Sequence, residues 1–152
     1  MSKFRFWVIG CMLVICLPSC RKGIVYSHFY PIPEAAWHID STMHFDFAIR
    51  DTNADYRTIV YVRHTECYPY QNMWLFVGDS MRCDTIEFYL ADDRGQWLGD
   101  RHHGFIEMPV LLEENRHFAD TGIYPLHITH AMRDSVLRGV TDIGLEITKV
   151  TQ

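Results

Sequence analysis

The seven residues MHFDFAI, Met43–Ile49, alternate large apolar side chains with polar or small ones. Successive side chains of a β-strand point to opposite faces, so this period of two puts the large apolar groups on one face and His44 and Asp46 on the other. Antiparallel sheets commonly cover a core with one face and meet solvent with the other. The stretch therefore predicts a strand of an antiparallel sheet packed on a hydrophobic core.

Five further runs rich in β-branched and aromatic residues repeat this pattern, namely Ile59–His64, Met73–Val77, Thr85–Leu90, Ile123–His130 and Leu145–Val150. Turn-forming residues separate the runs, as at Gly78-Asp79 and at positions 51–55 and 92–95. Short strands joined by turns predict an all-β fold, an antiparallel β-sandwich of the jelly-roll or immunoglobulin-like kind.

One segment departs from the period of two. Thr129 is a suitable helix N-cap, Gly139 is a suitable residue to end a helix, and apolar residues between them fall on one helical stripe. We therefore expect one short helix, Thr129–Arg138, before the last strand.

The N-terminal nineteen residues have the form of a secretory signal. Lys3 and Arg5 give a basic start, and the uncharged apolar run Phe6–Leu17 follows. Twelve helical residues span about 18 Å, which is too short to cross a hydrocarbon core of about 30 Å. A basic start followed by a short apolar run is typical of a cleaved signal peptide.

The apolar run ends in Leu17-Pro18-Ser19-Cys20, which resembles a bacterial lipobox, although Pro18 departs from the small residues that are commoner there. The resemblance implies that Cys20 becomes the mature N-terminus and carries the lipid that anchors the protein. The alternative is an ordinary signal peptide with a chance cysteine. No Asp follows Cys20, which favours the outer membrane, with the domain facing the periplasm.

These features predict three parts: a lipoprotein signal peptide (1–19), a lipidated tether with an extended segment (20–33) and a β-sandwich domain (34–152). The formal net charge of the chain is −5, and loss of two basic residues with the signal leaves −7. An acidic domain whose cations are scattered argues against nucleic acid as a partner.

Two cysteines remain in the mature domain, Cys67 and Cys83. An oxidising compartment permits a disulfide between them, and a loop of about 15 residues closed in this way would add about 3 kcal/mol of stability. The alternative is two separate thiols.

Motifs for chemistry are missing from the sequence. The nine histidines match no zinc-binding spacing, there is no G-x-S-x-G motif, and Asp92-Asp93 with Asp100 lacks the order of a calcium-binding loop. We therefore expect no catalytic residues, no metal, no cofactor and no small-molecule substrate.

Aromatic residues are abundant, and Tyr68, Tyr70 and Trp74 cluster beside a turn. Exposed Tyr and Trp rings favour binding of protein or sugar, whereas buried rings fill a core. We expect Trp37, Trp74 and Trp97 to lie in the core more readily than Tyr68 and Tyr70. The three clustered residues are nonetheless the candidate interaction surface.

Taken together, the motifs resemble the gliding-motility lipoprotein family GldH of Bacteroidetes. The resemblance rests on Arg63, Tyr68-Pro69-Tyr70-x-Asn72-x-Trp74-Leu75-Phe76, Asp84–Glu87, Leu90-Ala91, Trp97-x-Gly99, Gly122-x-Tyr124, Met132-Arg133 and Leu137-x-Gly139-Val140-x-Asp142–Leu145. It implies a non-enzymatic accessory protein of the gliding and type IX secretion machinery that contacts other cell-envelope proteins. The aromatic residues on a sandwich scaffold support an alternative, a carbohydrate-binding module of the cell envelope.

Overall fold

The computed structural model describes residues 23–79 and 81–150, and within them the regular structure is β-strand apart from one 3₁₀ turn, η1 (Pro33–Ala35). The signal segment and Cys20 lie outside the described residues. No helix in the described ranges is long and apolar enough to cross a membrane.

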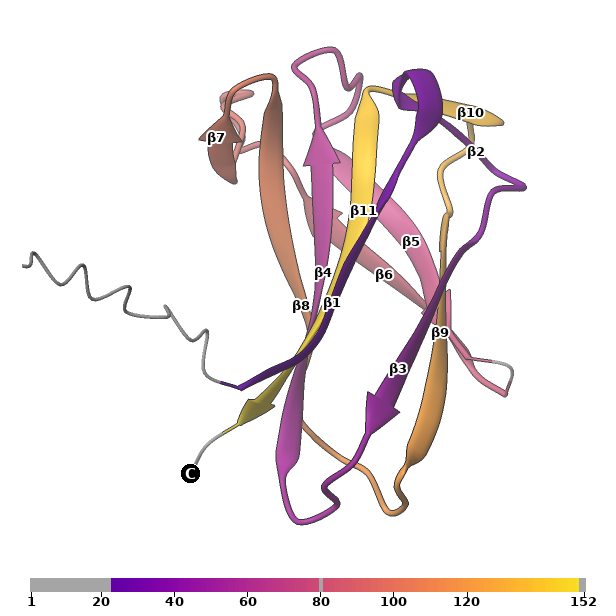
Figure 1. Cartoon of the computed structure of the whole chain (residues 1–152). Coiled ribbons are helices and arrows are strands. Elements are labelled where there is room, and N and C mark those ends of the chain that lie inside the picture. Colours follow the sequence, from indigo (N-terminus) through magenta and orange to yellow (C-terminus); the bar gives the residue numbers. More distant parts are fainter. Residues whose placement is uncertain (1–22, 80, 151–152) are drawn as a thin grey trace, which may run out of the picture.

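Two antiparallel sheets pack face to face and enclose the core (Figure 1). The five-stranded sheet has the order β1 (Ile24–Pro31), β11 (Val140–Val150), β4 (Asp55–His64), β8 (Phe105–His117) and β7 (Asp100–His102). The four-stranded sheet has the order β3 (Met43–Ile49), β9 (Gly122–His130), β5 (Asn72–Gly78) and β6 (Cys83–Tyr89). A small two-stranded sheet pairs β2 (Ala36–His38) with β10 (Val136–Arg138).

The period of two identified in the sequence produces this core. In β3, Phe45, Phe47 and Ile49 are buried while His44 and Asp46 are exposed. Strand β4 alternates in the same way along its whole length, with every second side chain buried. The prediction of an all-β fold with packed antiparallel sheets is confirmed.

The prediction of a helix over Thr129–Arg138 is wrong. The first two residues of that segment end β9, and its last three form β10, in which Leu137 pairs with Trp37 of β2. Both of these side chains are fully buried. Burial against a distant segment outweighs local helix propensity, which is a weak determinant. Gly139 does adopt a positive φ of 88°, but between two strands.

Strands β1 and β8 were not anticipated from the pattern. Strand β1 lies within the segment 20–33, which the sequence suggested is a tether with an extended part, and it pairs with β11 over most of its length. Strand β8 pairs with β7 only at its first residues, up to Glu107. Pro109 lies beyond that pairing, at the part of β8 that forms the sheet edge, where the missing N–H of proline is tolerated.

Candidate aromatic binding surface

The outer face of the four-stranded sheet carries large exposed rings. Alternation along β5 sends Met73, Leu75 and Val77 into the core, so Trp74 and Phe76 point outward. Their exposed fractions are 37% and 43%. Rings of this size are usually more buried, so two exposed on one strand mark a candidate interaction surface.

Neighbouring segments extend this apolar patch. Tyr89 of β6 stands opposite Asn72 of β5 and is 59% exposed, and Tyr70 in the preceding loop is 37% exposed. The amide of Asn72 donates a 2.7 Å hydrogen bond to Glu87, which holds β5 and β6 together between the rings. We define the aromatic surface as Tyr70, Trp74, Phe76 and Tyr89.

A hollow of about 390 Å³ opens at one end of the aromatic surface, lined by Tyr70, Asn72, Trp74, Ala131, Met132 and Arg133. The backbone of Trp74 fixes the segment after β9, because its N–H donates to the Met132 sulfur at 3.3 Å and its carbonyl accepts from the Ala131 N–H at 2.8 Å. The hollow is thus built from two segments far apart in sequence and offers both rings and polar groups.

The Tyr70 ring is held by an edge-to-face contact with the Tyr68 ring, 5.9 Å between ring centres, and by a hydrogen bond. Its hydroxyl donates a 2.6 Å hydrogen bond to the Asp134 carboxylate, and this bond raises the pKa of Tyr70 because loss of the proton would bring two anions together. A fixed ring loses little conformational entropy when a ligand stacks on it.

The residues predicted for this surface divide between surface and core. Tyr70 and Trp74 are exposed, but Tyr68 is only 3% exposed and donates a 2.9 Å hydrogen bond to the Asn72 carbonyl, so it belongs to the core. Trp37 is buried, Trp97 is half-buried, and Trp74 departs from the expectation that it fills the core. The sequence analysis overlooked Phe76, although the period of two already placed it beside Trp74.

The sequence left a disulfide between Cys67 and Cys83 and two separate thiols as alternatives, and in the structure both thiols are free and exposed. Cys67 precedes β5 and Cys83 pairs with Gly78 at its far end. A seven-residue strand is about 20 Å long, whereas a disulfide requires Cα atoms within about 7 Å. The fold therefore keeps the two cysteines apart.

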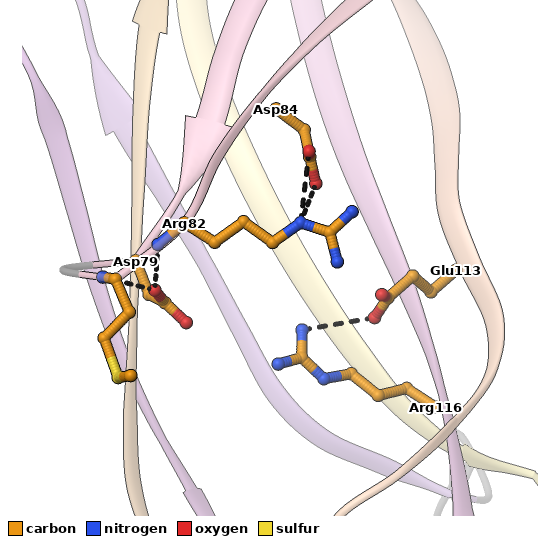
Figure 2. A network of polar contacts seen from close by, with 6 residues as sticks. Asp79, Arg82, Asp84, Glu113 and Arg116 are labelled. Carbon is orange, nitrogen blue, oxygen red and sulfur yellow. Dashed lines mark hydrogen bonds and ion pairs between the residues drawn. The ribbon is translucent and has the colours of Figure 1, made fainter.

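A second hollow, of about 160 Å³, lies between the two sheets where β6 faces β8. Ion pairs line it, as Figure 2 shows: Arg82 contacts Asp84 at 3.0 Å, and Arg116 contacts Glu113 at 3.2 Å. Asp79 accepts backbone N–H groups of Met81 and Arg82, which lowers its pKa. These charged side chains, most of them exposed, lie beside the edge strand β6, a feature that discourages unwanted strand pairing.

Within the described ranges, no group of three or more His, Cys, Asp or Glu side chains is arranged to hold a metal ion.

The fold and its surface define the class of protein as an all-β domain with an exposed aromatic face. Comparison with known proteins then identifies the family: the model of the GldH lipoprotein family matches residues 24–147, and the chain belongs to that family.

Two relatives match nearly the whole chain. The gliding motility lipoprotein GldH homolog of Christiangramia forsetii is 31% identical, and 90% of each chain is covered. The gliding motility lipoprotein GldH of Flavobacterium johnsoniae is 30% identical, with 90% of this chain and 91% of the relative covered. The protein is therefore a homologue of the gliding motility lipoprotein GldH, and as a lipoprotein it is anchored to a membrane.

Proposed function

We propose that the protein is a non-enzymatic accessory component of a cell-envelope assembly for gliding motility and type IX secretion, and that it binds a partner protein through the aromatic surface. The exposure of Tyr70, Trp74, Phe76 and Tyr89 together on one sheet face is the observation that supports binding. Tyr and Trp are enriched in the centres of protein interfaces, where they contribute most of the binding energy.

The anchor in this proposal is a lipid on Cys20, and the membrane is the outer membrane with the domain in the periplasm. The lipobox-like end of the signal segment supports the position of the lipid. Several acyl chains give stable attachment, whereas a single chain is marginal.

A complementation experiment tests the proposal. The gene is deleted, variants are returned, and secretion, surface motility and envelope integrity are scored. We expect Trp74→Ala combined with Tyr70→Ala to abolish rescue while the protein accumulates normally. Leu111→Ala is the matched control because Leu111 is 53% exposed on β8 of the other sheet. Full rescue by the double variant, or normal behaviour of the deletion strain, would count against the proposal.

The hollow beside Trp74 supports carbohydrate binding as a second candidate. The Tyr70 and Trp74 rings can stack on a sugar, while Asn72 and Arg133 offer hydrogen-bond donors. Binding on a glycan array that Trp74→Ala removes without unfolding would favour this candidate over a protein partner. An array without any bound glycan would exclude it.

A further inference from the structure

The distance between the lipid and the folded domain is short. If the proposed function is right in placing the lipid on Cys20, only Arg21, Lys22 and Gly23 separate it from β1, which begins at Ile24. The four residue-to-residue steps from Cys20 to Ile24 span at most about 14 Å. The Gly23 carbonyl also accepts a 2.7 Å hydrogen bond from the Lys149 N–H, so the sheet holds the end of this spacer.

Strand pairing determines which end of the sandwich lies near the bilayer. Ile24 pairs with Thr148 of β11, and Thr148 pairs with Arg57 near the start of β4. From there β1 runs about 23 Å to Pro31 at the opposite end. Figure 1 shows η1, β2 and β10 at that opposite end, together with the loop between β4 and β5 that contains Tyr70. We call the two regions the anchor end and the tip.

Charge favours the same contact at the spacer rather than at either end of the sandwich. Both ends carry more carboxylates than cations, and ion pairs lie at both, as in Lys149 with Asp51 at the anchor end and Arg101 with Glu66 at the tip. Arg21 and Lys22 follow the lipidated residue directly, and an anionic phospholipid surface attracts these basic residues.

We infer that the anchor end rests on the bilayer surface and that the sandwich stands upright on it. The anchor end therefore contacts an anionic phospholipid surface. The tip and the hollow at Tyr70 are then held about one strand length away from the lipid, where they meet a protein in the periplasm. This inference rests on the proposed lipidation and goes beyond it, because a lipid anchor alone sets no orientation.

The two free cysteines provide the test. Cys67 lies at the tip, next to Gly139. The two are so close that a Cβ added at Gly139 would lie 3.1 Å from the backbone carbonyl carbon of Cys67. Cys83 lies near the level of the anchor, because its partner Gly78 lines the same hollow as Thr58 of β4. Both thiols are exposed and accept a fluorophore.

The experiment uses the full lipidated chain in vesicles of zwitterionic and anionic phospholipid that contain an acceptor dye on the lipid headgroup. A donor dye is attached at Cys83 in Cys67→Ser and at Cys67 in Cys83→Ser. Energy transfer to the membrane should place Cys83 closer than Cys67 by about 20 Å, the length of β5. Equal distances, or a shorter distance for Cys67, would overturn the upright orientation.

Two controls distinguish a failure of the proposed lipidation from a failure of the proposed orientation. Flotation of the chain with vesicles, and its loss in Cys20→Ser, checks the anchor. A chain that does not float refutes the proposed lipidation, whereas one that floats with equal distances refutes only the orientation. A flexible spacer of about twenty Gly and Ser residues inserted between Lys22 and Gly23 should remove the difference in distance. If the difference persists, the short spacer does not set the orientation.

Discussion

The ring of Phe29 on β1 covers Gly144 on β11, its paired residue, so closely that a Cβ at position 144 would lie 2.4 Å from the ring atom Cε1. The ring cannot easily move aside, because the Arg63 guanidinium lies 3.9 Å from its centre and Tyr61 packs against it at 5.7 Å between ring centres. The glycine thus allows an aromatic side chain to lie across the strand that holds the N-terminal β1 in the sheet.

Gly144→Ala should lower the free energy of unfolding by about 1–3 kcal/mol, the usual cost of overpacking. Urea denaturation of the soluble domain measures it. Gly122→Ala is the matched control, because nothing lies within 4 Å of a Cβ at that position. Equal stability of the two variants would show that the ring of Phe29 can move at little cost.

Loss of the hydroxyl should destabilise the domain more at Tyr68 than at Tyr70. Tyr68→Phe removes a buried hydrogen bond to Asn72, so we expect a loss of about 1 kcal/mol in the free energy of unfolding. Tyr70→Phe removes a bond at the surface and should change stability by less than about 0.5 kcal/mol. Comparing the two unfolding curves checks that Tyr68 serves the core, and a larger loss for Tyr70→Phe would contradict it.

The stability of the domain should fall as the pH drops below about 6.5, the usual pKa of histidine. His64 and His130 are fully buried against Trp97 and Trp37, and burial lowers the pKa of each ring. As the pH falls, the unfolded chain therefore takes up protons on these two histidines before the folded chain does. The free energy of unfolding has its full value above about pH 6.5. Below that pH it decreases by on the order of 1 kcal/mol per pH unit for each histidine.

Denaturation curves between pH 7.5 and pH 5 measure this dependence, in a range where most carboxylates stay ionised. His130→Leu should flatten the dependence, whatever its effect on stability at pH 7.5. His117→Leu is the control, because His117 lies exposed beside Asp55. A dependence on pH that is the same in all three proteins would rule out the His130 ring as its cause.

Arg63 should contribute more to stability than Arg57, although both arginines form ion pairs on β4. Arg63 contacts Glu107 at 2.7 Å and lies between the rings of Phe29 and Phe105. We expect Arg63→Ala to cost about 1–3 kcal/mol, through lost packing and cation–π contact. Arg57→Ala, which breaks a pair with Glu114 that is nearly half-exposed, should cost less than about 1 kcal/mol. Similar losses in thermal or urea unfolding would contradict the difference.

The alternation in Met43–Ile49 and in the other runs was sufficient to predict the fold class, because a period of two is a local property that each strand needs before it can cover a core. The segment Thr129–Arg138 could not be predicted in the same way. Its local signals suit a helix, but Leu137 gains more by burial against Trp37. That gain depends on a strand distant in the sequence.

The sequence by itself determined six of the sheet-forming segments, the lipobox-like end at Cys20 and the family resemblance, since all three depend on residues that are adjacent or ordered along the chain. Tertiary structure alone decided that Tyr68 is buried while Trp74 is exposed, and that β5 separates Cys67 from Cys83. The physical reason is that burial and distance depend on which segments pack together, and sheet pairing joins residues across the whole length of the domain.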